Sequence, residues 1–214
     1  MRTQSICLII ICITAPLLVS GCGRRTAIVK DYYMIQSQRS MPPSAERSRM
    51  ILEVVPFSIG AGYQSKGLVY YLGNQKYDSD FYSEYFMPPA QMITVQTENW
   101  LTASGLFAQV LPVTSLVDST HVLEGNVRQI YYDIQDSSHY QAVLDITFYL
   151  LAQKDRSEAE IYFTKNYRTA VRYQENNQQQ AVNAMQVCLK EILTNLENDL
   201  TDNLKTSTST PRNP

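Results

Sequence analysis

The segment from Gly60 to Gly67 is the part of the chain that most suggests phosphate binding. It reads Gly-Ala-Gly-Tyr-Gln-Ser-Lys-Gly and follows a strand-like run. A dinucleotide-binding glycine loop opens a helix, and a P-loop ends in Gly-Lys followed by Ser or Thr. Here Gly67 is followed by the run from Leu68 to Leu72, which is typical of a strand. Neither phosphate motif is present, and the segment is interpreted as a flexible hairpin loop.

Side chains suited to acid–base or metal chemistry are few and scattered. The chain has two histidines, His121 and His139, and neither lies in a zinc-binding or nucleophile-elbow spacing. Asp78, Asp80 and Glu84 alternate along a tyrosine-rich run. They could hold a hard cation loosely, but such acids more often form the solvated face of a strand. The sequence predicts no catalytic residue, no metal and no cofactor, and we expect a protein that is not an enzyme.

Cys22 is the residue whose surroundings predict a defined chemical modification. Arg2 precedes an apolar run from Ile6 to Val19, as in an export signal. As a helix this run spans about 20 Å, short of the ~30 Å hydrocarbon core of a membrane. It ends in Leu-Val-Ser-Gly-Cys, residues 18–22, which resembles the lipobox of bacterial lipoproteins. The resemblance implies cleavage before Cys22 and acylation of its thiol. An ordinary secretory signal or an uncleaved signal anchor is the alternative.

The residues around the other cysteines and after Cys22 add two expectations. In lipoproteins of this type, an aspartate after the acylated cysteine favours retention in the inner membrane. Gly23 at that position implies the periplasmic face of the outer membrane. Cleavage would remove Cys7 and Cys12, so Cys188 would be the one thiol left and no intramolecular disulfide could form. We expect Cys188 to be a small apolar residue beside the buried face of a helix, with pairing between chains or thiol reactivity as the alternatives.

The charge balance argues against nucleic acid as a partner. The chain has 18 Lys and Arg against 20 Asp and Glu. Residues 1–21 contain Arg2 and no acid, so cleavage would change the net charge from −2 to −3. Such a chain has no electrostatic attraction for phosphate backbones. The remaining length suits one domain that can bury a core without disulfides.

We expect four segments along the chain. They are a lipoprotein signal peptide (1–21), a lipidated tether (22–49), a folded domain (50–204) and a disordered tail (205–214). The tether is polar and interrupted by Pro42-Pro43, although the segment from Tyr32 to Ile35 could dock as a short strand. The tail has no apolar residue, which favours disorder.

Hydrophobic periodicity predicts the elements of the folded domain. Period-two alternation indicates long strands over 122–132, 141–151 and 159–173, and shorter strands over 50–57, 68–72, 81–86 and 107–111. A helix is expected between Pro88-Pro89 and Gly105, with a second whose apolar stripe includes Leu189. The order strands, helix, strands, helix lacks alternating βαβ units. It predicts an α+β fold in which an antiparallel sheet of about five to seven strands carries two main helices on one face.

Aromatic side chains are the candidates for a contact surface. The chain has 15 tyrosines, many of them clustered. Exposed aromatic clusters suit protein interfaces or lipid-facing grooves, whereas within a sheet they also serve cross-strand pairing. Both interpretations stay open. We expect partner or lipid contact at Tyr70, Tyr71, Phe81, Phe86 and Trp100.

Several pieces between about Tyr32 and Leu200 occur in the order of one known family. They are Tyr32-Tyr33, Val-Val-Pro-Phe at 54–57, Leu-Val-Tyr-Tyr at 68–71, the run from Tyr85 to Phe107 with Pro88-Pro89, Met92 and Leu101, Leu-Glu-Gly-Asn-Val at 123–127, the long strands and the closing helix. Behind a lipobox, this order resembles the ABC-type transport auxiliary lipoproteins, the outer-membrane partners of MCE-domain lipid transport systems. The family often has an arginine after Leu-Val-Tyr and a tryptophan before the helix-opening proline. This chain has Tyr71 and Phe86-Met87 there, so partner contacts at these positions would differ.

The resemblance implies a non-enzymatic component anchored in the inner leaflet of the outer membrane. It would receive or deliver phospholipid at the end of a periplasm-spanning conduit, with an MCE-domain protein as partner and ATP hydrolysis in other subunits. It also allows a homo-oligomer. An envelope assembly lipoprotein for lipopolysaccharide or outer-membrane proteins is the alternative, and a basic, lipid-A-binding face would favour it. A glycan-binding or hydrolytic envelope protein would need a cleft of aromatic and carboxylate side chains.

Overall fold

A computed structural model describes residues 29–155 and 158–209 of the chain. Cys22 and the predicted signal peptide lie outside the described residues. The strands are β1 (Asp31–Tyr33), β2 (Ile51–Val54), β3 (Ser58–Ile59), β4 (Gly67–Tyr71), β5 (Tyr77–Tyr85), β6 (Gln109–Pro112), β7 (His121–Asp133), β8 (Tyr140–Asp155) and β9 (Glu158–Tyr173). The helices are the short η2 (Ala61–Tyr63), α2 (Pro89–Ser104) and α3 (Gln178–Ser209).

Strand β7 is the centre of the sheet, because other strands pair with both its edges. One edge pairs antiparallel with β8, and β8 pairs antiparallel with β9. The other edge is covered in succession by β2, β3 and β4, all parallel to β7. Leu52 lies opposite His121, Ser58 opposite Asn126 and Tyr70 opposite Tyr132. Residues 52–71 therefore follow β7 as an interrupted strand, with Pro56 in the gap between β2 and β3.

The expected antiparallel sheet of five to seven strands is wrong in strand number and in direction. Within the described residues the sheet has nine strands, and five of its eight pairings are parallel. The long hairpins β7–β8–β9 and the β4–β5 pair are antiparallel as expected. Alternation of apolar residues predicts a strand and its buried face, but it does not encode the direction of a distant neighbour. Helix α2 returns the chain so that β6 runs parallel to β2.

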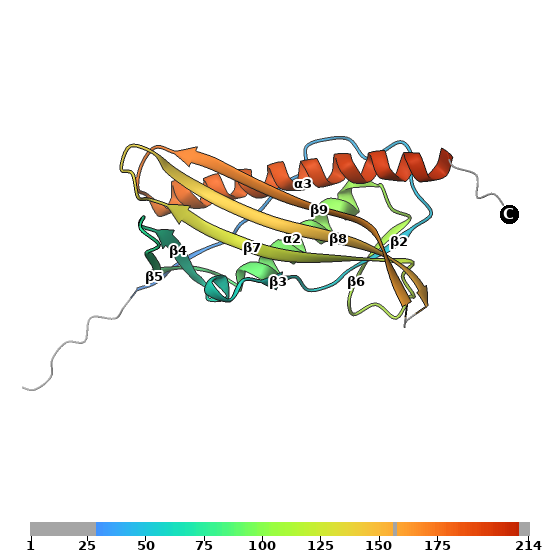
Figure 1. Ribbon diagram of the computed structural model, residues 1–214, viewed down its shortest axis with the longest axis horizontal. Helices are drawn as coiled ribbons and strands as arrows, with labels where there is room; N and C mark the ends of the chain where they lie inside the picture. The colour runs from blue at the N-terminus through green and yellow to red at the C-terminus, as the bar shows by residue number, and fades with distance from the viewer. Residues whose placement is uncertain (1–28, 156–157, 210–214) are drawn as a thin grey trace, which may run out of the picture.

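The order strands, helix, strands, helix and the α+β class are confirmed. Both helices lie behind the long strands β7, β8 and β9 in Figure 1, where α3 contacts β8 and β9 and α2 contacts β2 and β6. Gly105 ends α2 with a φ of 68°, the left-handed conformation expected of a glycine C-cap. The predicted stripe of α3 is completely buried, with Met185, Leu189 and Ile192 all at 0% exposure.

Two predicted boundaries change, one at residues 31–35 and one at residues 205–209. Asp31–Tyr33 forms β1, parallel to β5, and Ile35 is fully buried, so the expected tether belongs to the fold from Asp31 onward. Strand docking of Tyr32 and Tyr33 is thereby confirmed. Helix α3 continues to Ser209, whereas 205–209 was expected to be disordered. Leu200 extends the buried stripe, and extending a formed helix costs far less than starting one.

The domain is elongated, and its two ends differ. Strands β1, β4 and β5 lie at one end in Figure 1. Strand β6, the loop that follows it, the last residues of β8 and the first residues of β9 lie at the opposite end (Figure 1). Among the described residues, no helix is long and apolar enough to cross a membrane.

Candidate functional site

The five residues expected to contact a partner or lipid do not form one surface. Phe81 and Phe86 are exposed, by 56% and 60%. Tyr70 is half-buried against Tyr132, with ring centroids 5.8 Å apart. Tyr71, the next residue along β4, points to the opposite face of the sheet and joins a second apolar cluster there.

Trp100 is a core residue, which corrects its assignment to a contact surface. It is 2% exposed on the buried face of α2. Its indole N–H donates to Glu197 Oε2 at 2.8 Å, and Glu197 also accepts hydrogen bonds from Arg39 Nε at 2.8 Å and Arg39 Nη2 at 2.7 Å. The Arg39 and Glu197 side chains are 5% and 7% exposed. This contact with Glu197 raises the pKa of Arg39. Through Glu197, these hydrogen bonds join Arg39 to both α2 and α3.

Four aromatic side chains form an exposed aromatic patch at the β1–β5 end of the sheet: Tyr32, Phe81, Tyr82 and Phe86. Each is at least 56% exposed. Tyr32 and Phe86 meet edge to face with centroids 6.4 Å apart, and Phe81 and Tyr82 do so at 5.3 Å. Sequence reasoning missed Tyr32 and Tyr82. The docking of β1 on β5 places Tyr32 in the patch, and only that long-range pairing could have revealed it.

Backbone contacts fix the position of the patch. The Asp80 carboxylate accepts hydrogen bonds from the Tyr82 and Ser83 N–H groups at 2.8 and 2.9 Å. This local turn lets the consecutive rings of Phe81 and Tyr82 lie against each other. The Phe86 N–H donates to the carbonyl of Tyr33 at 2.8 Å, and so joins the end of β5 to β1. Asp80 therefore has a structural role, in place of the cation contact that its spacing allowed.

Lys30 connects the aromatic patch to the sheet. Its ammonium lies 4.3 Å from the centroid of Phe81 and forms an ion pair with Glu84, within hydrogen-bonding distance. The Lys30 side chain is 25% exposed and Glu84 is 19% exposed, so the pair is partly shielded from water. The patch thus combines exposed rings with one cation held among them.

A tyrosine cluster covers the face of the sheet opposite the helices, with members Tyr63, Tyr71, Tyr77 and Tyr131. Tyr71 lies directly opposite Tyr77 in the β4–β5 register, with ring centroids 4.9 Å apart, and Tyr131 contacts both rings at 6.0 Å. Tyr63 stacks on Tyr131 at 6.5 Å. Burial raises the pKa of Tyr63 to about 12. Cross-strand pairing, the alternative interpretation of the clustered tyrosines, therefore explains Tyr71.

An apolar groove of about 500 Å³ lies between the start of α2 and the strands β2 and β6. Residues lining it include Val54, Phe57, Ala90, Val95 and Val113. Val95 is 41% exposed on the outer side of α2. The volume lies within the range of roughly 300–1,000 Å³ that small-molecule sites usually have. The groove can accept an apolar ligand along one side of the domain.

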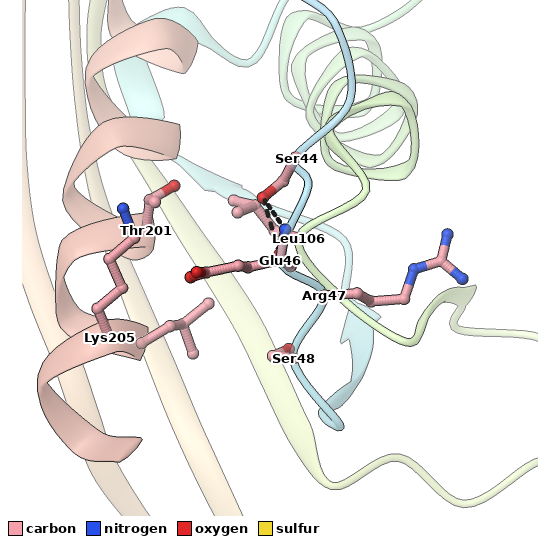
Figure 2. A pocket seen from close by; sticks show the side chains of 8 residues that line it. Ser44, Glu46, Arg47, Ser48, Leu106, Thr201 and Lys205 are labelled. Atoms are coloured by element: carbon pink, nitrogen blue, oxygen red, sulfur yellow. Dashed lines mark hydrogen bonds between the residues drawn. The ribbon is translucent and has the colours of Figure 1, made fainter. Parts of the chain in front are cut away.

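A smaller cavity of about 140 Å³ lies between residues 44–48 and the last turns of α3. Figure 2 shows Glu46 pointing from this segment toward α3, while Arg47 points away from it. The Ser44 hydroxyl donates to the carbonyl of Glu46 at 2.7 Å, which closes a tight local turn. Leu106 and Leu204 supply apolar walls. The cavity lies where residues 44–48 pack against α3.

The two histidines have local partners at the strand ends where the sequence places them. His121 begins β7 and contacts the ring of Tyr162 with centroids 5.6 Å apart, and burial lowers its pKa. His139 lies just before β8, where Nδ1 is 2.9 Å from Asp136 Oδ2. Hydrogen bonds from Ser138 and His139 lower the pKa of Asp136 to about 2. Among the described residues, no group of three or more His, Cys, Asp or Glu could hold a metal ion.

The glycine-containing segment and Cys188 also have structural positions. The Gly60 N–H donates to the carbonyl of Val127 at 2.9 Å, and η2 follows before Gly67 opens β4. The segment joins two parallel strands on the same edge of β7, so it is not the expected hairpin loop. Cys188 is buried on α3 as expected, and its thiol donates to the carbonyl of Ala142 at 3.3 Å. Burial raises its pKa to about 12.

Comparison with known proteins finds similarity in structure only. No family model matches the sequence, and no curated protein matches it. Protein XCC0632 from Xanthomonas campestris, of the family DUF330, has a similar structure with a TM-score of 0.72 and 17% sequence identity. The match covers 84% of this chain and 99% of that one. The hypothetical protein CT253 from Chlamydia trachomatis matches with a TM-score of 0.50 and 8% identity, over 70% of this chain and 96% of that one. The chain therefore has the same α+β fold as these bacterial proteins.

Proposed function

We propose that the protein is a non-enzymatic lipoprotein component of an MCE/ABC-type phospholipid transport system, anchored in the inner leaflet of the outer membrane. The observation that carries the proposal is the sequence resemblance to ABC-type transport auxiliary lipoproteins, over about residues 32–200. The likeness in fold to the DUF330 protein, which includes almost all of that chain, is compatible with it. Energy would come from an ATPase in another subunit.

The apolar groove is the surface best suited to the phospholipid itself. Its walls come from α2 on one side and from β2 and β6 on the other, with Phe57 between them. A lipid acyl chain gains free energy by leaving water for such walls, in proportion to the apolar area that it buries. The polar head group would remain outside, in solvent or in contact with the MCE-domain partner.

A direct test uses a matched pair of valines. Val95 lines the groove and is 41% exposed, and Val187 lies on α3 and is 43% exposed. The substitution Val95→Trp should fill the groove and reduce cross-linking of a phospholipid that carries a photoreactive acyl chain. Val187→Trp adds the same bulk elsewhere and should leave cross-linking unchanged. Equal labelling of both variants and the native protein would contradict lipid binding in the groove.

The transport role itself is tested in cells. The lipoprotein, isolated from gently solubilised envelopes, should retain an MCE-domain protein, and its deletion should weaken the lipid barrier of the outer membrane. Because no proton transfer is proposed, a His121→Gln/His139→Gln variant should restore the barrier fully. Failure of the folded double variant to restore it would favour a catalytic or metal-dependent role. Absence of any MCE-domain protein from the purified complex would oppose the transport assignment.

A further inference from the structure

The aromatic patch lies close to the position where the lipid anchor must be. Val29, the first described residue, is 77% exposed, and Tyr32 of the patch follows three positions later. Cys22 precedes Val29 by seven residues. Seven residues can span at most about 25 Å when fully extended. An acyl chain on Cys22 would therefore hold Val29, which precedes the patch by three residues, within about that distance of the membrane surface.

The chemistry of the patch suits the head-group layer of a lipid bilayer. Tyrosine side chains favour this layer, where the ring contacts acyl carbons while the hydroxyl stays in water, and phenylalanine adds apolar contact with the acyl carbons. Tyr32, Tyr82 and Phe86 are all exposed by at least 56% at one end of an elongated domain. Lys30, paired with Glu84, holds its ammonium over the Phe81 ring, so its charge is already compensated within the protein.

Charge near the patch is nearly balanced. The charged residues of β1, β4, β5 and the positions next to these strands are Lys30, Lys66 and Lys76 against Asp31, Asp78, Asp80 and Glu84. Such a surface has no net attraction for anionic lipid. Any binding to a bilayer must therefore come mainly from the aromatic rings, and it should depend little on salt or on lipid charge.

We propose that the aromatic patch inserts into the head-group layer of the bilayer that holds the Cys22 acyl chains. The inference rests on the lipidation included in the proposed function. Insertion makes the long axis of the domain point away from the membrane. The loop after β6, which contains the 99% exposed Leu116, then faces the periplasm (Figure 1). The anchor keeps the local concentration of lipid high, so even weak contacts of four rings persist.

Tryptophan fluorescence can test this arrangement on the full lipidated protein. Trp100 is the one tryptophan of the chain and is 2% exposed, so it provides a shielded background signal. The Phe86→Trp variant places a reporter in the patch, and Leu116→Trp places a matched reporter at the opposite end. Each variant is reconstituted into vesicles of phosphatidylcholine and phosphatidylethanolamine, with or without brominated acyl chains that quench nearby indoles.

We expect brominated lipid to quench Phe86→Trp and to shift its emission to shorter wavelength, while Leu116→Trp stays unquenched. Adding Phe81→Ser and Tyr82→Ser to the Phe86→Trp variant should abolish the quenching although the protein still floats with vesicles. Quenching should persist at high salt in these vesicles, which contain no anionic lipid such as phosphatidylglycerol. Loss of quenching at high salt would contradict the apolar basis of the contact.

Other outcomes separate this inference from the proposed function. Protein that floats with vesicles but shows no quenching at position 86 is lipidated, and the docking inference is then wrong. A blue shift at position 86 without bromine quenching would show that a second protein surface covers the patch, and would also overturn it. Protein that does not float contradicts lipidation itself, and both proposals fail together. Quenching equal at positions 86 and 116 would exclude the proposed orientation.

Discussion

Loss of Arg39 should be among the most damaging single changes in this protein outside its apolar core. The Arg39 and Glu197 side chains are 5% and 7% exposed, and the guanidinium donates two hydrogen bonds to the carboxylate. The Arg39→Met substitution keeps much of the apolar stem but leaves Glu197 with the Trp100 N–H as its remaining side-chain donor. Removing one partner of a buried ion pair costs about 3–5 kcal/mol. For a domain of this size the melting temperature should fall by roughly 6–20 °C.

A second ion pair with α3 supplies the control. Lys165 bonds to Asp199 at 2.7 Å, but these side chains are 49% and 29% exposed. Exposed pairs contribute about 0–1 kcal/mol, so Lys165→Met should change the melting temperature little. The Trp100→Phe substitution should cost about 1.5–3 kcal/mol, because it removes a hydrogen bond to a charged group.

Urea and thermal unfolding of the purified mature domain, followed by circular dichroism, measure all three variants. The reasoning is refuted if Arg39→Met costs no more than Lys165→Met. In that case water reaches Glu197, and the segment around Arg39 is not held between α2 and α3. A double variant of Arg39 and Trp100 should show a coupling energy of about 0.5–3 kcal/mol, since both donors share one carboxylate.

Three further substitutions and one reactivity measurement test the anchor and the core. Cys22→Ser should abolish fatty-acid labelling and the cleavage that depends on it; unchanged labelling would disprove the lipobox assignment. Cys188, whose pKa burial raises to about 12, should react with Ellman's reagent only after unfolding, and rapid reaction of the native protein would contradict that burial. Leu189→Ala should cost about 2–5 kcal/mol, because the side chain is fully buried, and an unchanged melting temperature would place it outside the core. Gly125→Ala should cost about 1–3 kcal/mol, because its Cβ would lie 2.6 Å from ring atoms of Phe57; a neutral result would mean that this ring moves freely.

Local patterns along the chain predicted most of the elements correctly. The alternation around β7, β8 and β9 and the stripe that includes Leu189 matched their strands and helix, because each pattern reports one buried face of one element. Gly105 ended α2 as expected, since a left-handed residue at a helix end is a local requirement. The prediction that Cys188 lies beside the buried face of a helix was also correct, because that face follows from the local apolar stripe.

Candidate contact residues were predicted less well than elements. Phe81, Phe86 and Trp100 were all expected at a contact surface, yet the first two are exposed and Trp100 is in the core. An apolar side chain in an amphipathic helix or edge strand can be buried in the fold or left for a partner. Its exposure depends on which other segment covers it, and that segment can lie more than a hundred residues away.

The amino-acid sequence by itself determined the α+β class, the order of the elements, the faces that they bury and the motif around Cys22. Only the tertiary structure decided the parallel pairing of β2, β3 and β4 on β7, the docking of β1 on β5 and the contact of Arg39 with Glu197. Periodicity arises from the geometry of a single element. Strand direction, and the choice of which polar or aromatic groups meet, arise from competition among distant segments for the same buried space.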